Sequence, residues 1–268
     1  MRKAMQPFFV NLPLSYVARD RWYLNEFIER RLAPELGLDA EIIAQADPAW
    51  HRETAAALRK AELPCAVHLP FFDLQPGSRD EYILQATRRR LESVRDIVGI
   101  YGPRHMIAHG GHTHLYADSR REWLERAVST WSGFMRSWPG HPPLYLENVY
   151  EADPQPLQDL LAGLAGHNAG VCFDAGHWHS FSGGCRKKNL SGWIAALGPY
   201  VKHLHLHDND GSLDGHLGLG QGTIPWEALF AELAKSAVHP GVTIEPHTAQ
   251  DLGHSLDFMQ RHPAWFGG

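Results

Sequence analysis

The chain has little cysteine, and its three cysteines form no Cys-x-x-Cys pair. An odd number of isolated thiols argues against a disulfide framework and is typical of a reducing compartment. Cys65 and Cys172 also lie in apolar runs, where packing is the ordinary role of a cysteine. We therefore expect reduced thiols and a cytoplasmic protein.

Long runs of a single residue class are missing as well. No segment reaches the roughly 18 consecutive apolar residues of a membrane span, and the N-terminus lacks the apolar stretch of a signal peptide. The formal net charge is −5, and no long basic run is present to grip phosphates. These features exclude a membrane protein and argue against binding of duplex DNA. They leave a small molecule as the expected partner and are compatible with an oligomer.

Histidine, in contrast, is frequent, with 18 in 268 residues, and it recurs with acidic residues at the ends of short apolar runs. Examples are Val-His-Leu-Pro, Leu-Glu-Asn, Phe-Asp-Ala-Gly-His and Ile-Glu-Pro. The nine residues in these positions are His68, His109, Glu147, Asp174, His177, His205, Asp214, His216 and Glu245. Imidazole and carboxylate groups are ligands for divalent zinc, manganese, iron, nickel and cobalt. Because these candidate ligands lie at the ends of many different strands, we expect them to meet in one shared cavity. The sequence therefore predicts a metalloenzyme.

Short apolar segments alternate with longer amphipathic ones along the whole chain. The segments predicted as strands are 8–12, 39–44, 65–69, 105–109, 144–149, 170–174, 201–207 and 242–245. Those predicted as helices lie near 20–33, 49–62, 79–101, 119–137, 155–166, 190–197, 225–236 and 253–261. Eight such units predict a single α/β domain over residues 1–268, a (β/α)8 TIM barrel. A doubly wound open sheet is the alternative, but no Gly-x-Gly-x-x-Gly follows the first strand.

The alternation within strands indicates which side chains point inward. In the segment 201–207, Leu204 and Leu206 share one face, whereas His203, His205 and His207 share the other. The other late strands place their acidic residue at the C-terminal end, where the active sites of such barrels lie. An unpaired buried carboxylate is very costly, and no lysine or arginine occupies a neighbouring inward position. A metal ion is the expected partner, with a buried salt-bridge network as the alternative.

Together these motifs resemble the xylose-isomerase-like TIM-barrel superfamily, which includes sugar isomerases and epimerases and also endonuclease IV. The resemblance implies a mononuclear metal site of Glu147, Asp174, His205 and Glu245, as in the isomerases. The endonuclease IV pattern implies three zinc ions. The first would be held by His68, His109 and Glu147, the second by the mononuclear set, and the third by His177, Asp214 and His216.

Two departures from the endonuclease pattern argue against DNA repair. The chain reads Val149-Tyr150-Glu151 after Glu147-Asn148, where the endonucleases have a small, Gly-rich continuation. Gly215 stands where those enzymes have an arginine. The stretch from His207 to Gly211 and the glycines that follow look more like the sugar isomerases and epimerases.

Counting charge gives the expected number of ions. The four carboxylates of the nine-residue set carry −4, so one divalent ion leaves −2, whereas three ions leave +2. Only the positive cavity would attract an anionic substrate. We therefore expect two or three ions in each chain.

The function that we infer is a divalent-metal-dependent sugar or sugar-phosphate isomerase or epimerase of carbohydrate metabolism. It would transfer a proton at a metal-chelated hydroxy-carbonyl substrate, with Glu147, Glu245 and His177 as the catalytic residues. Phe71, Trp178 and Trp226 would stack on the substrate, or simply pack. A multinuclear phosphoester hydrolase acting on a small substrate is the first alternative. A metal-binding protein without catalysis is the second.

Overall fold

The computed structural model describes residues 8–236 and 239–266, and its eight strands close into a parallel barrel. The strands are β1 Phe9–Pro13, β2 Ala33–Gly37, β3 Ala66–His68, β4 Met106–His109, β5 Leu144–Glu147, β6 Ala169–Asp174, β7 Val201–Leu206 and β8 Gly241–Ile244. Each strand pairs with the next, and β1 pairs with β8 to close the ring. The (β/α)8 fold predicted from the sequence is confirmed.

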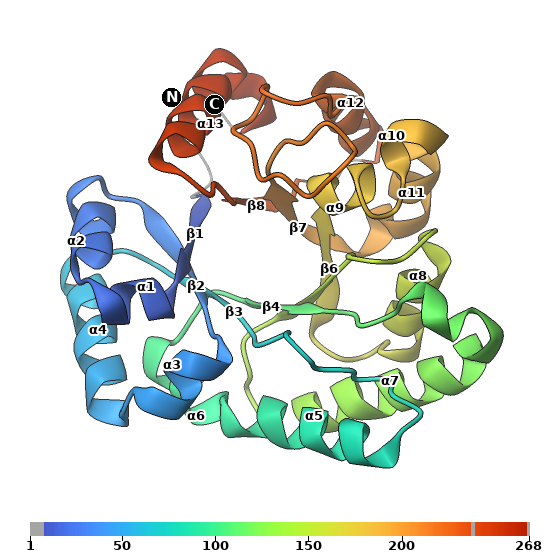
Figure 1. Ribbon diagram of the computed structural model, residues 1–268, viewed down its shortest axis with the longest axis horizontal. Helices are drawn as coiled ribbons and strands as arrows, with labels where there is room; N and C mark the ends of the chain where they lie inside the picture. The colour runs from blue at the N-terminus through green and yellow to red at the C-terminus, as the bar shows by residue number, and fades with distance from the viewer. Residues whose placement is uncertain (1–7, 237–238, 267–268) are drawn as a thin grey trace.

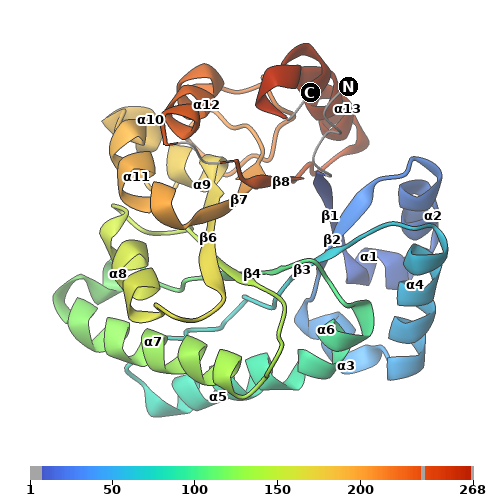
Figure 2. The ribbon, with the colours of Figure 1, turned by 180° about the vertical axis from the view of Figure 1, so that it is seen from behind.

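Helices follow the strands and form an outer ring, seen from one end in Figure 1 and from behind in Figure 2. The α-helices are α1 Leu14–Arg19, α2 Trp22–Glu29, α3 Ala40–Gln45, α4 Pro48–Lys60, α5 Glu81–Ser93, α6 Arg95–Tyr101, α7 Arg120–Arg136, α8 Gln155–Gly163, α9 Ala175–His179, α10 Gly184–Lys187, α11 Leu190–Leu197, α12 Trp226–Lys235 and α13 Ala249–Arg261. The 3-10 helices are η1 His114–Ser119, η2 Gly198–Tyr200 and η3 Pro263–Trp265. Among the described residues, no helix combines the length and apolarity needed to cross a bilayer.

Several helices begin where a polar side chain caps the first turn. The side chains of Asp39, Asp47 and Asp80 accept hydrogen bonds from backbone N–H groups at the starts of α3, α4 and α5. Thr248 does the same for α13. Each cap satisfies a donor that the helix itself leaves free, and so it fixes the residue at which the helix starts.

The prediction of the second strand was wrong. Residues 39–44 contain two adjacent isoleucines, which favour a strand, but they form α3 because Asp39 caps a helix there. The second strand, β2, is instead the preceding Ala-Pro-Glu-Leu-Gly segment, part of which had been predicted as the end of a helix. Because β2 covers residues 33–37, Glu35 lies at an inward-facing position of the barrel, where its side chain is fully buried.

The apolar core lies between the barrel and its helices, and the polar side chains lie inside the barrel. Leu204 and Leu206 of β7 belong to this outer core, as do the fully buried Trp131 of α7 and Trp193 of α11. The alternate residues of β7 point into the barrel, as strand geometry requires. The packing between strands and helices therefore holds the strand ends that build the site.

Candidate metal centre

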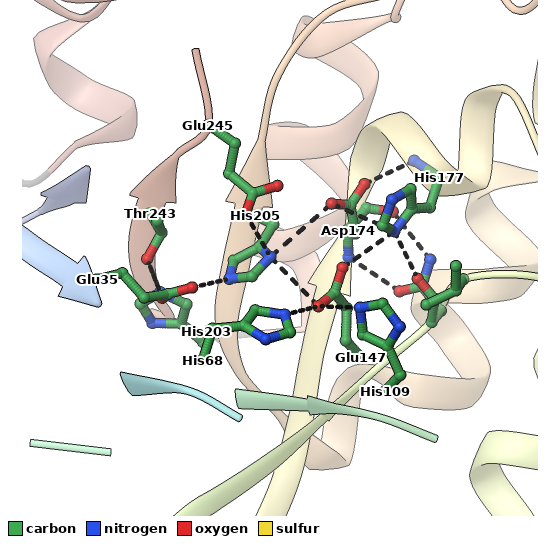
Figure 3. Close-up of polar contacts among 12 residues, drawn as sticks. Glu35, His68, His109, Glu147, Asp174, His177, His203, His205, Thr243 and Glu245 are labelled. Carbon is green, nitrogen blue, oxygen red and sulfur yellow. Dashed lines mark hydrogen bonds and ion pairs between the residues drawn. The ribbon is translucent and has the colours of Figure 1, made fainter. Parts of the chain in front are cut away.

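Successive strands deliver polar side chains to one end of the barrel. His68, His109, Glu147 and Asp174 are the last residues of β3, β4, β5 and β6, and Glu245 follows β8 directly. The carboxyl ends of parallel strands in a closed barrel meet at the same face. Their side chains therefore converge over the barrel axis (Figure 3).

A first group joins His68, His109 and Glu147, whose donor atoms lie within 4.8 Å of one another. Oε2 of Glu147 is 3.1 Å from Nε2 of His68 and 3.6 Å from Nε2 of His109. Nδ1 of His68 lies 2.9 Å from the carbonyl oxygen of Leu69, which can only accept a hydrogen bond. Nδ1 therefore carries a hydrogen, and Nε2 is turned toward the group.

A second group surrounds Nδ1 of His205. This atom lies 3.5 Å from Oε2 of Glu147, 3.9 Å from Oδ2 of Asp174 and 3.3 Å from Oε1 of Glu245. All four side chains are buried. Three carboxylates around one ring nitrogen would repel one another strongly without a cation between them.

A third group contains His177, Asp214 and His216, and the structure adds His207 to it. Oδ2 of Asp214 is 3.4 Å from Nε2 of His177 and 3.2 Å from Nε2 of His216. Nε2 of His207 lies 3.6 Å from Oδ1 of Asp214 and 3.3 Å from Oδ1 of Asp174. His207 thus links the third group to the second.

The first turn of α9 places His177 between the groups. The backbone N–H of His177 donates to Oδ1 of Asp174, which caps this short helix. Nδ1 of His177 then lies 3.0 Å from Oε1 of Glu147. The Asp-Ala-Gly-His motif therefore fixes two candidate ligands through one helical turn. All nine residues singled out from the sequence lie in these three adjoining groups.

The structure also brings in Glu35, which the sequence analysis missed. Oε1 of Glu35 lies 3.0 Å from Nε2 of His205, on the ring edge opposite the three carboxylates. Asp39 could have indicated this strand in the sequence. An aspartate that caps a helix at that position requires the preceding strand to end just before it. A strand over residues 33–37 would then have placed Glu35 on the inward face.

The ionisable side chains that the structure brings together in the site are acidic groups and histidines. Every ion-pair partner of Glu147, Asp174, Asp214 and Glu245 among the described residues is a histidine. Burial opposes protonation of His205, but the acidic groups around it hold its pKa well above its usual value. The same balance raises the pKa of His216 to about 9. Among the described residues these carboxylates therefore have no lysine or arginine partner, and histidines are the only basic side chains paired with them.

The two glutamates that face Nδ1 of His205 differ in acidity. Burial raises the pKa of Glu245 above its usual value. Burial acts in the same direction on Glu147, but His205 and His109 outweigh it and hold the pKa of Glu147 well below its usual value. One carboxyl group therefore retains a proton more readily than the other.

The donor set fits divalent metal ions. Oδ2 of Asp174, Oδ1 of Asp214 and Nδ1 of His205 are buried and have no hydrogen-bond partner among the described residues. Buried polar atoms without partners are rare in native proteins. Carboxylate oxygens and imidazole nitrogens that converge in this way have the composition of zinc, manganese or iron sites.

Two aromatic stacks flank the groups. The ring of Phe71 stacks on His109 at 4.2 Å, and the exposed Phe72 packs on Phe71. In the second stack, the ring of Phe181 lies on His177 at 5.4 Å and contacts Tyr150, and both aromatic residues are exposed. In both stacks, one aromatic ring contacts a candidate ligand and its aromatic neighbour is exposed to solvent.

Trp178 and Trp226 are buried, unlike these aromatic residues. The indole N–H of Trp178 donates to Asn189, and that of Trp226 donates to Asp208. Both contacts fit the packing alternative for these two tryptophans. Phe71 remains the predicted substrate contact that borders the groups.

Comparison with known protein sequences gives distant relatives. The family described as xylose isomerase-like TIM barrel matches residues 30–262. An uncharacterized protein of Methanocaldococcus jannaschii is 25% identical over 212 residues, which cover 75% of this chain and 70% of that protein. A probable endonuclease 4 of Mycobacterium ulcerans is 27% identical over 190 residues, which cover 67% of this chain and 72% of the relative.

Solved structures share the fold over nearly the whole chain. A protein of Thermus thermophilus, soaked with ZnCl2, is 29% identical with a TM-score of 0.76, and the match covers 96% of this chain and 97% of that one. A D-tagatose 3-epimerase-like protein is 21% identical with a TM-score of 0.78, and the match covers 97% of each chain. At 21% identity, the likeness to the epimerase-like protein shows a shared fold.

Proposed function

Because this chain belongs to the xylose isomerase-like TIM-barrel family, we propose that it is a divalent-metal-dependent isomerase or epimerase of a sugar or sugar phosphate. The observation that carries this proposal is the pair Glu147 and Glu245. Both carboxyl groups lie within 3.5 Å of Nδ1 of His205, and their pKa values are shifted in opposite directions. A pair with separated pKa values suits the removal of a proton by one group and its return by the other.

The protonation state of each residue decides whether it accepts or donates a proton in the proposed reaction. Glu147 is held ionised, so it is the group that accepts a proton from the substrate carbon next to a carbonyl. Glu245 keeps its proton more readily, so it is the group that returns one. His177, whose pKa is raised well above its usual value by Asp174, Asp214 and Glu147 against the effect of burial, donates to a substrate oxygen.

The nine residues of the three groups are those that would hold metal ions, and zinc, manganese, iron, nickel and cobalt all suit their donor atoms. A bound divalent ion would polarise a substrate carbonyl and acidify the adjacent C–H bond. Phe71 would then pack on the apolar face of the sugar ring, as aromatic rings commonly do at ligand sites.

A phosphoester hydrolase of small substrates is the second candidate. It is favoured by the full set of three adjoining groups, because paired metals clamp the attacking and leaving oxygens of a phosphoester. The relatives named as probable endonuclease 4, which are 26–27% identical, support the same reading. An isomerase needs fewer ligands, so this candidate explains more of the site.

Exchange of substrate hydrogen with solvent separates the two candidates. Metal-loaded protein is incubated in heavy water with D-tagatose, D-psicose, D-fructose and L-ribulose, the sugars named with the structural neighbours. Mass spectrometry then reports deuterium at carbon, and a chromogenic phosphodiester reports hydrolysis in parallel. Deuterium uptake without ester cleavage supports the isomerase, whereas ester cleavage without deuterium uptake reverses the choice.

A further inference from the structure

A buried polar layer lies directly beneath His205, deeper in the barrel. We call Glu35, His105, His203 and Thr243 the lower layer, and each of these side chains is at most 5% exposed. The layer spans β2, β7 and β8 and the residue just before β4, and Figure 3 shows Glu35 and Thr243 on the side of His205 away from Glu147. No part of the proposed chemistry uses these residues. Their polar atoms therefore need another explanation, because burying them is costly.

The hydrogen bonds of this layer run in one direction. The hydroxyl of Thr243 donates to Oε2 of Glu35 over 2.6 Å. Nε2 of His203 lies 2.7 Å from the same hydroxyl oxygen. Because the only hydroxyl hydrogen of Thr243 points to Glu35, the contact from His203 must be an N–H donated to the oxygen. The chain of donors therefore ends on the carboxylate of Glu35.

The second oxygen of Glu35 faces His205. Oε1 lies 3.0 Å from Nε2 of His205, close enough for an ion pair, and neither atom makes a regular hydrogen bond to any of the described residues. Nδ1 on the other edge of the ring faces Glu147, Asp174 and Glu245 at 3.3–3.9 Å. One edge of the imidazole thus meets a lone carboxylate, and the other edge meets the candidate metal group.

We propose that Glu35 is a positioning residue that holds a hydrogen on Nε2 of His205 and thereby presents Nδ1, free of hydrogen, to a divalent cation. This inference rests on the proposed metal-dependent function. A carboxylate behind a ligating histidine fixes the tautomer and orientation of the ring and makes it a better ligand. Thr243 and His203 hold the carboxylate in turn, so that Glu35 stays aimed at His205.

The charge of Glu35 fits this role. Burial opposes its ionisation, but His205 and other histidines lower the pKa of Glu35 to about 2. No lysine or arginine is paired with it among the described residues. A structural carboxylate in a barrel core would ordinarily be paired with a basic side chain. Among the described residues, the only basic side chains within ion-pair distance of Glu35 are the histidines His203 and His205.

The test compares zinc binding by Glu35→Ala, Glu35→Gln and Thr243→Val with that of the unchanged protein. Each protein is stripped with a chelator and then titrated with zinc against a chromophoric competitor. We expect Glu35→Ala to weaken one zinc site roughly 10–100-fold, the usual cost of removing the group behind a ligating histidine. Glu35→Gln should recover part of this loss, because its amide oxygen still accepts the Nε2 hydrogen. Thr243→Val should show a smaller loss in the same direction.

Ring nitrogen NMR of His205 in the zinc-loaded protein gives a readout that packing alone would not change. The unchanged protein and Glu35→Gln should show a slowly exchanging hydrogen on Nε2, and Glu35→Ala should lose this protection. His105→Leu is the matched control, since the ring of His105 packs at a tilt against His203 in the same layer, and its Nε2 has no hydrogen-bond partner among the described residues. It should keep both the zinc affinity and the Nε2 hydrogen.

The outcomes separate this inference from its premise. If the unchanged protein binds neither zinc nor any of the other divalent ions that suit its donor atoms, the metal-dependent function fails, and the positioning role fails with it. If it binds zinc and Glu35→Ala binds as tightly with the same ring spectrum, only the positioning role is overturned. An equal loss in Glu35→Ala and His105→Leu would also overturn it, because general packing would then explain the effect. Should Glu35→Ala not fold, Glu35→Gln and Thr243→Val decide by the same measurements.

Discussion

At the scale of single residues, Glu147 joins the groups of the site. One of its oxygens faces His68, His109 and His205 at 3.1–3.6 Å, and the other lies 3.0 Å from His177. One carboxylate thus meets imidazoles from four different segments of the barrel. A neutral side chain of the same shape would remove the negative charge that these four rings share as a partner.

Glu147→Gln should abolish the proposed isomerisation and remove at least one bound metal equivalent. The amide keeps the size of the side chain but can no longer accept a substrate proton, so we expect kcat/KM to fall by roughly 10²–10⁴-fold. Deuterium exchange and elemental analysis of metal-replete protein measure the two effects. Glu53→Gln, on the exposed face of α4, is the control and should change neither. A Glu147→Gln protein with full activity would contradict the proposed role.

Glu151 gives a prediction about pH. Burial raises the pKa of this residue from 4.5 to about 7, although the N–H of Val149 donates to its carboxylate. Between these values the folded protein holds a proton that the unfolded chain has lost, so the free energy of unfolding falls as pH rises and levels off above about 7. Glu151→Gln removes this dependence while keeping an acceptor for Val149. The variant should therefore gain up to about 3 kcal/mol over the unchanged protein at about pH 8, and little at about pH 4.

Thermal and urea unfolding in the presence of a chelator test this prediction, because bound metal would alter the charge around Glu151. The difference between the two proteins should grow with pH. A difference that is constant, or that shrinks as pH rises, would show that the carboxyl group is not held protonated in the folded state.

At the scale of elements, the sequence predicted seven of the eight strands because each is a short apolar run between longer amphipathic segments. Six of them, β3 to β8, also end at or beside a histidine or a carboxylate. β2 was missed because its five residues include a proline and no β-branched side chain, whereas the isoleucines of α3 imitate a strand. Glu35 was lost with that strand. The nine candidate ligands were found because each residue type is visible in the sequence, but the role of His207 between two groups depends on the path of β7 into the next loop.

The short helix α9 has to pass close to β7, and Gly176 makes this possible. A methyl group at Gly176 would overlap the ring of His207, which contacts both Asp174 and Asp214. Gly176→Ala should therefore destabilise the protein by about 1–3 kcal/mol and weaken metal binding at the third group. Gly192→Ala in α11 is the matched control, because no heavy atom lies within 4 Å of its added methyl group. That change should stabilise the protein by about 0.5–1 kcal/mol.

Urea unfolding and zinc competition measure both variants. The two glycine replacements are predicted to change the free energy of unfolding in opposite directions. If Gly176→Ala is as stable as Gly192→Ala and binds zinc normally, the ring of His207 has room to move, and its link between the groups is not required.

At the scale of the whole molecule, the barrel concentrates negative charge around one axis. Glu35, Glu147, Asp174 and Glu245 are buried there, and Asp214 lies beside them, while the only charged partners among the described residues are histidines. Without metal, the histidines with raised pKa values must carry protons to offset these carboxylates. With metal, the same nitrogens must release those protons before they can coordinate.

Removal of metal should therefore lower stability and take up protons at the same time. Each ion that binds only the folded protein at a thousandfold excess over its Kd adds about 4 kcal/mol to the free energy of unfolding, which corresponds to a rise in Tm of roughly 10 °C. Chelated protein should unfold at a correspondingly lower temperature and recover when zinc is returned. Calorimetric titration in buffers of different ionisation enthalpy should show proton release with each ion bound.

The number of ions tests the charge argument directly. With at least two divalent ions, the four carboxylates of the predicted ligand set are fully offset, and the cavity can accept an anionic substrate. Elemental analysis of metal-replete protein should therefore give two or three equivalents per chain. A single equivalent, with no change in Tm on chelation, would mean that protonated histidines, and not a second ion, neutralise the remaining carboxylates.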